Sequence, residues 1–216
     1  MERLNGLKVV WSQRAIRRDM GLTEETFAPV VRSSSIRVLL AFGLQNDMII
    51  HQIDVITAFL NGKLQEDIYM QQPAGYEVPG KETLVCKLKK ALYGLKQSPR
   101  CWNKSFQDFL LNLGFQQSTA DPCVFVNPDA DSMTVITVYV DDLIVMSTTT
   151  EQLNDTKKTL PEKFKMKDMG PLHYCLGITI VQDGNCLWLH QKQYILSMLQ
   201  KFGLMPNQFQ PHQTQM

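Results

Sequence analysis

The fold is decided by the stretch Val135-Ile136-Thr137-Val138-Tyr139-Val140-Asp141-Asp142-Leu143-Ile144-Val145-Met146. Two runs rich in β-branched residues flank Asp141-Asp142, a pattern that predicts two strands joined by a tight turn. One interpretation of the pair is the turn itself, because aspartate tolerates turn conformations. The other is a metal site, because adjacent carboxylates concentrate negative charge that Mg²⁺ neutralises. The two residues by themselves leave both interpretations open.

Asp54 is the candidate for a third carboxylate. It lies in the Ile- and Val-rich run 48–59, which predicts a buried strand that ends near Asp54. Aspartate is disfavoured inside a strand, so its presence indicates either a solvent-facing strand end or a ligand. With Asp141 and Asp142 it would complete a two-metal site, whose ions lie about 3.5–4 Å apart and activate an attacking oxygen while stabilising a leaving one.

Residues 81–104 form a basic segment. It contains seven cations and one acid, Glu82, and its net charge is therefore +6. Tyr93 and Trp102 are interspersed. Such a segment is either the solvated face of a helix with its flanks or a surface that follows nucleic-acid phosphates. The cations are Lys81, Lys87, Lys89, Lys90, Lys96, Arg100 and Lys104.

The overall composition excludes few classes of protein. The 216 residues include 22 basic and 21 acidic side chains, a balance that excludes a polycation or an acidic tail but not nucleic-acid binding. No apolar run approaches the roughly 18 residues that span a bilayer, and the first ten residues are too weakly apolar for a signal peptide. The protein is therefore expected to be intracellular. Its five scattered cysteines are expected to be reduced and buried.

Working outward, the sequence predicts an α+β fold with helices on an antiparallel sheet. Serine hydroxyls are expected to cap two helices, one through the run 33–35 and one through Ser98, with Pro99 at the first turn and Gly114 as the stop. A turn is predicted at Asn61-Gly62. Strands are predicted over 84–88, 124–126, 134–140, 143–146, 174–181 and 186–189, helices over 151–160 and 193–202, and a disordered tail over 205–216.

Six segments in order give the chain its resemblance to a known family. It resembles the reverse transcriptase domain of Ty1/copia-type LTR retrotransposons from about residue 20 to residue 204, and the six segments together are highly specific. The matching stretches are Glu24 to Val31, Asp54-Val55-Ile56-Thr57-Ala58-Phe59-Leu60-Asn61-Gly62, Ala91-Leu92-Tyr93-Gly94-Leu95-Lys96-Gln97-Ser98-Pro99-Arg100, Tyr139-Val140-Asp141-Asp142, Leu176-Gly177, and Gln193-Tyr194-Ile195 through Gly203.

The resemblance implies a right-hand polymerase with a ferredoxin-like βαββαβ palm, partial fingers and RNA-directed DNA polymerase activity with two Mg²⁺ or Mn²⁺ ions. It assigns the ions to Asp54, Asp141 and Asp142 and makes Phe59 a steric gate against the 2′-hydroxyl. Core packing for Phe59 and a turn aromatic for Tyr93 are the simpler alternatives. Nucleotide or template contacts are implied for Tyr93, Lys96, Gln97, Ser98 and Pro99, a primer grip for Leu176 and Gly177, and nucleic-acid contacts for Lys87, Lys89, Lys90 and Arg100.

The resemblance also implies a boundary and a set of partners. Residues 23–204 are expected to form fingers and palm, after a divergent segment 1–22 that lacks the family's Lys-x-Arg-Leu-Val stretch. The expected partners are an RNA or DNA template–primer, deoxynucleoside triphosphates and the integrase and RNase H of a longer polyprotein, in a cytoplasmic particle or the nucleus. The alternative is a catalytically inactive relic that binds nucleic acid or protein.

Overall fold

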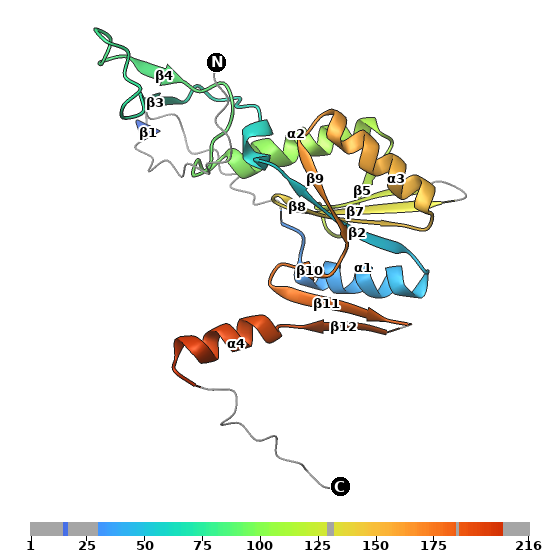
Figure 1. Cartoon of the computed structure of the whole chain (residues 1–216). Helices are drawn as coiled ribbons and strands as arrows, with labels where there is room; N and C mark the ends of the chain where they lie inside the picture. The colour runs from blue at the N-terminus through green and yellow to red at the C-terminus, as the bar shows by residue number, and fades with distance from the viewer. Residues whose placement is uncertain (1–14, 17–29, 129–131, 185, 205–216) are drawn as a thin grey trace.

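A six-stranded antiparallel sheet is the centre of the fold (Figure 1). The computed structural model describes residues 15–16, 30–128, 132–184 and 186–204. The strand order β5-β6-β7-β8-β2-β9 places β2 and β8 in the interior of the sheet, side by side. The strands are β2 (Ile49–Val55), β5 (Gln116–Gln117), β6 (Val124–Pro128), β7 (Met133–Tyr139), β8 (Asp142–Ser147) and β9 (Met166–Pro171).

Helices cover both faces of this sheet. Figure 1 shows α2 (Ser98–Asn112) and α3 (Thr150–Thr159) on one face and α1 (Ser33–Gln45) on the other. α1 packs closely, because a Cβ added at Gly43 would lie 3.2 Å from Ile50 and 3.3 Å from Met146. Coverage of both faces explains why β7 and β8 are almost continuously apolar instead of alternating. The mixed helix and antiparallel sheet agree with the predicted α+β class.

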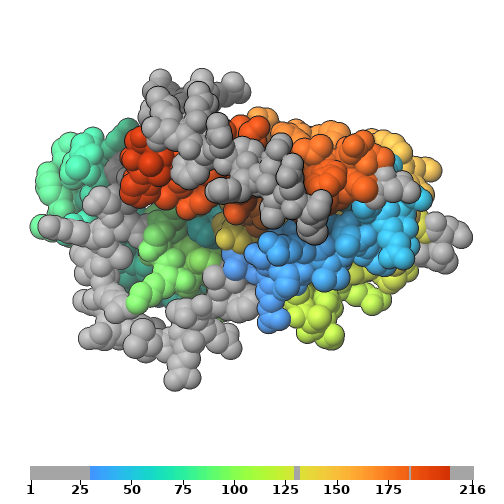
Figure 2. All heavy atoms as spheres, turned by 90° about the horizontal axis from the view of Figure 1, so that it is seen from below, coloured from blue at the N-terminus to red at the C-terminus, as the bar shows by residue number. Residues whose placement is uncertain are grey.

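Two smaller sheets flank the central layers. The sheet β10-β11-β12 lies beside α1 and is followed by α4, and Figure 2 shows these elements together on one face. The second sheet has the order β1-β3-β4. The elements are β1 (Ala15–Ile16), β3 (Tyr69–Gln71), β4 (Val85–Lys87), β10 (Tyr174–Cys175), β11 (Ile178–Asp183), β12 (Cys186–His190), α4 (Lys192–Lys201) and the 3-10 turns η1 (Ala58–Asn61) and η2 (Leu160–Glu162).

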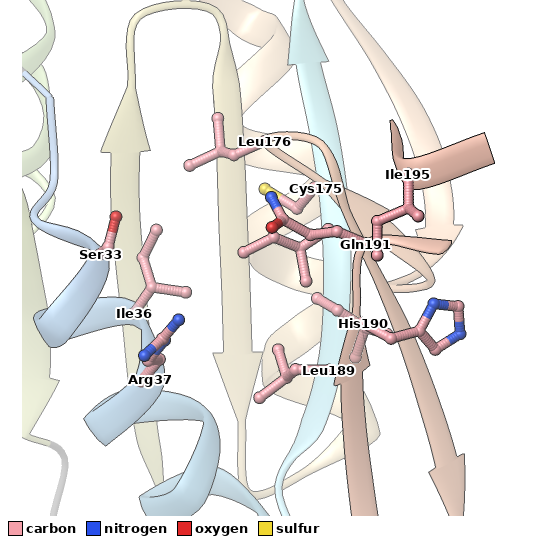
Figure 3. Close-up of a pocket in the computed structure, with 11 residues that line it drawn as sticks. Ser33, Ile36, Arg37, Cys175, Leu176, Leu189, His190, Gln191 and Ile195 are labelled. Carbon is pink, nitrogen blue, oxygen red and sulfur yellow. The ribbon is translucent and has the colours of Figure 1, made fainter. Parts of the chain in front are cut away.

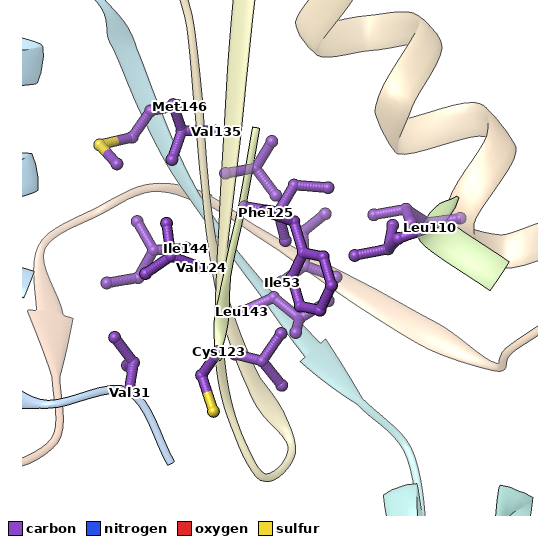
Figure 4. Close-up of a cluster of buried hydrophobic side chains, with 14 of the residues drawn as sticks. Val31, Ile53, Leu110, Cys123, Val124, Phe125, Val135, Leu143, Ile144 and Met146 are labelled. Carbon is purple, nitrogen blue, oxygen red and sulfur yellow. The ribbon is translucent and has the colours of Figure 1, made fainter. Parts of the chain in front are cut away.

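The core fills the space between the sheet and its helices (Figure 4). Trp102, Phe106 and Leu110 of α2 are fully buried, as the apolar spacing along this helix predicts. Phe164, which follows η2, joins them with ring centroids 5.1 Å from Trp102 and 5.6 Å from Phe106. The strands predicted over 84–88, 124–126, 134–140, 143–146 and 186–189 are confirmed, as are the helices over 151–160 and 193–202. The tail 205–216 lies outside the described residues.

Both predicted serine caps are wrong. Ser98 is the first residue of α2, and its hydroxyl donates to the carbonyl oxygen of Leu92. At α1 the residue before the helix is Arg32, with no side-chain cap, and the Ser35 hydroxyl donates to Asp121 instead. Serine hydroxyls are donors as well as acceptors, so a nearby stronger acceptor removes them from the capping role.

Asp121 was not predicted to matter, yet it ties α1 to the start of β6. Its carboxylate accepts from Ser35 Oγ at 2.7 Å and from the backbone N–H groups of Arg32 and Cys123, each at 3.0 Å. Burial raises the pKa of Asp121, but the hydrogen bonds from Ser35, Arg32 and Cys123 outweigh burial, and the net pKa is below its usual range.

Three further differences concern the C-terminal half and the thiols. The strand predicted over 174–181 is broken at Leu176-Gly177, where both residues have positive φ, into β10 and β11. β9 was missed because four of the six residues of Met166–Pro171 are charged residues, glycine or proline, which mask its strand pattern. All five cysteines are free, but Cys86 and Cys186 are exposed, and the prediction of burial is wrong for them.

We expect Asp121→Ala to lower the free energy of unfolding by about 3 kcal/mol, because it leaves one buried and two partly buried donors without their acceptor. Urea denaturation measures the loss. Asp108→Ala is the matched control, since Asp108 forms only an exposed pair with Lys104, and it should cost less than about 0.5 kcal/mol. Equal effects of the two substitutions would contradict this account.

His51 makes the fold sensitive to acid. Burial, and then the charge of Lys157, lower the pKa of His51 below its usual value, although Asp168 opposes them. As the pH falls, His51 of the unfolded chain therefore takes up its proton at a higher pH than His51 of the folded protein. The contribution of neutral His51 to the free energy of unfolding is present above about pH 6.5 and is lost as the pH falls. We expect His51→Gln to reduce the change in unfolding free energy between pH 7 and pH 5. An unaltered pH dependence would contradict this assignment.

Candidate active site

Strand register brings two of the three predicted carboxylates together. β2 and β8 pair antiparallel with Asp54 directly opposite Asp142. Directly paired residues point to the same face of a sheet, with Cβ atoms about 4.5–5.5 Å apart. That face is the one covered by α1, since Ile50 and Met146 form another pair of the same parity and lie against Gly43. Both carboxyl groups are half-buried at the end of the sheet.

Asp141 belongs to the turn that joins β7 to β8. Tyr139 pairs with Asp142, so Val140 and Asp141 form a two-residue turn. Val140 has φ +57°, which such hairpin turns require at the first position but which a β-branched residue rarely adopts. The backbone N–H of Val55 donates to the carbonyl oxygen of Asp141 at 2.7 Å. The predicted turn is therefore confirmed, and Asp142 lies directly opposite Asp54. The metal site stays a prediction.

The charges of this cluster are not balanced. Burial raises the pKa of Asp142, a hydrogen bond from Gln52 lowers it, and the charges of Asp141 and Asp54 raise it again, with a net result above the usual range. Gln52 Nε2 donates to Asp142 Oδ1 at 3.0 Å. Burial, together with the nearby charge of Asp142, raises the pKa of the Cys175 thiol to about 12. A cation placed here would relieve this repulsion.

The three aspartates have the right chemistry for a hard dication, but they do not converge closely enough to bind one without further ligands. Three carboxylates offer the oxygen ligands that Mg²⁺ prefers. Within the described ranges, however, no three His, Cys, Asp or Glu side chains converge closely enough to hold a metal ion by themselves. Mg²⁺ is commonly bound through one or two carboxylates together with substrate phosphates, and Asp54 and Asp142 are suited to that arrangement.

Phe59 and Tyr93 form an aromatic pair over the carboxylate cluster. Their ring centroids are 4.7 Å apart with the planes tilted by 49°. Burial and then the charge of Asp141 raise the pKa of Tyr93, against backbone hydrogen bonds at Phe59 and Ala58, and Asp54 contributes a smaller rise. The Tyr93 hydroxyl therefore lies within the electrostatic reach of both aspartates. Phe59 is half-buried, so packing and exposure to a ligand coexist.

The segment from Tyr93 to Gln97 is a loop that leads into α2, and Ser98 and Pro99 are the first two residues of that helix. Lys96 is exposed and Gln97 is half-buried. Ser98 is fully buried, and its bond to Leu92 fixes the loop rather than offering its hydroxyl to a ligand. Pro99 lies in the first turn of α2, as predicted. Tyr93 and Lys96 are exposed, and Gln97 and Pro99 are partly exposed.

Leu176 and Gly177 form the tight turn between β10 and β11, with φ values of +52° and +79°. Beside this turn lies a groove of about 440 Å³ between α1 and the sheet β10-β11-β12 (Figure 3). Its lining combines apolar side chains with polar ones at the rim, including Arg37 and His190. Cys175 lines the groove, and the charge of Asp142 contributes to the raised pKa of its thiol, so the groove adjoins the carboxylate cluster.

The basic segment carries less free charge than its sequence indicates. Three of its seven cations pair with acids outside it: Lys87 with Asp67 at 2.6 Å, Lys104 with Asp108 at 2.9 Å, and Arg100 with Glu66. These pairs lower the net charge of +6 to +3. Lys89, Lys90 and Lys96 are exposed and form no ion pair with another described residue.

Three residues at the site were missed by sequence reasoning. Gln52 contacts Asp142, and its position two residues before Asp54 on one strand face could have indicated it. Lys167 of β9 pairs in register with Asp54 and is exposed, so its side chain leaves the sheet on the same face as that of Asp54. Trp102 Nε1 donates to the carbonyl oxygen of Val140 at 2.7 Å, a contact that no sequence spacing could predict.

Comparisons of the sequence with known proteins identify one family. The family model described as reverse transcriptase (RNA-dependent DNA polymerase) matches residues 10–214. The chain is 40% identical over 184 residues to the retrovirus-related Pol polyprotein from transposon TNT 1-94 of Nicotiana tabacum, covering 84% of the chain and 14% of that polyprotein. For the Pol polyprotein from transposon RE1 of Arabidopsis thaliana the identity is 41% over 180 residues, covering 83% and 12%.

More distant relatives come from yeast. The Transposon Ty1-DR4 Gag-Pol polyprotein of Saccharomyces cerevisiae is 31% identical over 150 residues, covering 69% of the chain and 8% of that polyprotein. The chain thus spans about 8–14% of the length of these relatives. Among the described helices, none is long and apolar enough to cross a membrane.

We expect Gln52→Leu to raise the pKa of Asp142 further and to lower the free energy of unfolding at pH 7 by about 1–3 kcal/mol, because the carboxylate loses its side-chain donor. Because the pKa of Asp142 rises, this loss of stability is largest where its carboxyl group is ionised, and it becomes smaller as the pH falls and the group takes up a proton. Carbon-13 NMR of the carboxyl group and urea denaturation measure the two effects. Gln116→Leu, on the exposed edge strand β5, is the control.

Proposed function

Since the chain belongs to the reverse transcriptase (RNA-dependent DNA polymerase) family of Ty1/copia-type transposon polyproteins, we propose that it extends a primer on an RNA template. In this proposal residues 23–204 form the fingers and the palm. The substrates are a template–primer and deoxynucleoside triphosphates. The integrase and RNase H of a longer polyprotein are the proposed partners. The observation that carries the proposal is the register of β2 and β8, which pairs Asp54 with Asp142 next to Asp141.

Asp54, Asp141 and Asp142 would hold two Mg²⁺ or Mn²⁺ ions together with the substrate phosphates. When bound, such ions favour the ionised primer 3′-hydroxyl and neutralise charge on the pyrophosphate that leaves. The raised pKa of Asp142, caused by burial and by its acidic neighbours, supports this assignment because a dication would remove the repulsion. Lys167, paired in register with Asp54, would bind an oxygen of the triphosphate.

The remaining proposed roles follow the geometry around the carboxylates. The Phe59 ring, supported by Tyr93, would crowd a 2′-hydroxyl and so favour deoxynucleotides. Lys96 and Gln97 would contact the incoming nucleotide or the template, while Ser98 and Pro99 shape the loop from within. The turn Leu176-Gly177 would contact the primer strand, since its neighbour Cys175 lies within the electrostatic reach of Asp142.

Primer extension on an RNA template with Mg²⁺ or Mn²⁺ tests this proposal. We expect incorporation of deoxynucleotides, and we expect Asp142→Asn to lower its rate by on the order of 10²–10³-fold because charge stabilisation at the reacting phosphate is lost. Asp155→Asn is the matched control, since Asp155 is exposed on α3, which lies on the sheet face opposite the one to which Asp54 and Asp142 point. Folded protein that shows no extension, or extension that survives Asp142→Asn, would refute the catalytic assignment.

A second candidate function is nucleic-acid binding without catalysis by a retrotransposon-derived relic. The observation in favour of this function is the spacing of the carboxylates: among the described residues, they do not form a complete metal site without further ligands. The exposed cations Lys89, Lys90 and Lys96 would carry the binding in either case. Lys87 and Arg100 are proposed as weaker contributors because each already pairs with an acid.

We expect the triple substitution Lys89→Gln, Lys90→Gln and Lys96→Gln to weaken template–primer binding and to reduce the slope of log affinity against log salt by about 2–3 units, one for each lost phosphate contact. Fluorescence anisotropy at several salt concentrations measures this slope. Lys87→Gln is the control and should change it by less than about one unit. Unchanged binding by the triple variant would refute the role of this surface in both candidate functions.

A further inference from the structure

The turn that carries Asp141 has a conformation that needs support. Val140 is β-branched and has φ +57°, in a region that costs such residues of the order of 1–3 kcal/mol. Residues of this kind persist only where their surroundings hold them in place. Both peptide carbonyls of the turn have donors: Val55 N–H for Asp141, and the Trp102 indole N–H for Val140, each at 2.7 Å. Two fixed carbonyls set the directions in which Asp141 and Asp142 leave the backbone.

Trp102 reaches this turn from behind. It belongs to α2, on the sheet face opposite α1, whereas Asp54 and Asp142 point to the face that α1 covers. It is fully buried, with 0% of its surface exposed. It therefore contacts the backbone of the turn without any access to a substrate, and its effect on chemistry can come only through the position of the turn.

The indole is itself held firmly. Its ring centroid lies 5.1 Å from that of Phe106 and 5.1 Å from that of Phe164, the latter in an edge-to-face arrangement. The backbone of α2 at Trp102 is also closely packed. A Cβ added at Gly62 would lie 2.8 Å from the Trp102 backbone nitrogen, so only glycine fits there. The short η1 segment that carries Phe59 therefore rests on the same part of α2. One helix segment supports both the aspartate turn and the aromatic residue beside it.

We propose that Trp102 is a positioning residue for the aspartate turn: its indole N–H holds the Val140 carbonyl and thereby keeps Asp141 and Asp142 directed toward Asp54. The inference rests on the proposed function for the use of that position, but the position itself is measurable without activity. The same hydrogen bond explains why Trp102 Nε1 can be buried among apolar side chains, because the single N–H donor of the indole is satisfied.

Amide hydrogen exchange tests the positioning directly. Trp102→Phe keeps an aromatic ring but removes the donor, so the Asp141 carbonyl that accepts from Val55 should move more freely. We expect exchange at the Val55 amide to accelerate about five- to tenfold more than at the Val124 amide, which bonds to Asp121 in the same sheet. General destabilisation would accelerate both amides equally. Trp188→Phe, at an exposed tryptophan of β12, is the matched control and should change neither.

Binding of Mn²⁺ in the presence of a saturating non-hydrolysable deoxynucleoside triphosphate, followed by paramagnetic broadening of amide signals near Asp54 and Asp142, separates this inference from the proposed function. We expect Trp102→Phe to need a several-fold higher Mn²⁺ concentration for half-maximal broadening than Trp188→Phe. Equal exchange ratios and equal Mn²⁺ binding in the two variants would overturn the inference and leave the function standing. Selective exchange at Val55 without Mn²⁺ binding by the natural protein would support the positioning and refute the metal-dependent function. Trp102→Leu replaces Trp102→Phe if the latter does not fold.

Discussion

The antiparallel pairing of β2 with β8 is the interaction on which the site depends. Its register places Asp54 opposite Asp142, and a shift by one residue would turn one of the two carboxylates to the other face. Burial on both faces enforces this register, because Ile53, Leu143 and the residues around them would lose their contacts with the core if the strands slipped. Core packing thus holds like charges next to one another at the end of the sheet.

The surroundings of the pair divide into a supporting side and an open side. α2 lies behind the turn and contributes the indole of Trp102, while α1 lies in front and is anchored through Asp121 at its first turn. The open side contains Phe59 with Tyr93, and the groove beside β10. Rigid elements therefore carry the carboxylates, and the loops that would meet a substrate are arranged around them, a division common to sites that depend on exact placement of charge.

Much of this could be predicted from the sequence, for identifiable reasons. The apolar periodicity of α2 and the β-branched runs of β7 and β8 report burial directly, and Asp54 was identified because a charged residue in a buried strand is unusual. What could not be predicted depends on contacts distant in sequence. Ser35 donates to Asp121, 86 residues away, instead of capping its helix, and Arg100 pairs with Glu66, 34 residues away. Local pattern says nothing about which acceptor lies closest after folding, nor about the acids that neutralise a basic segment.

The proposed role of the three aspartates at the end of this sheet is to hold divalent cations. Anomalous diffraction at the manganese edge can locate such ions in crystals of the protein with a template–primer, a non-hydrolysable deoxynucleoside triphosphate and MnCl₂. We expect two peaks bounded by the carboxyl oxygens of Asp54, Asp141 and Asp142, with the register of β2 and β8 unchanged. Bound nucleotide with no peak at these carboxylates, or with manganese held elsewhere, would contradict it.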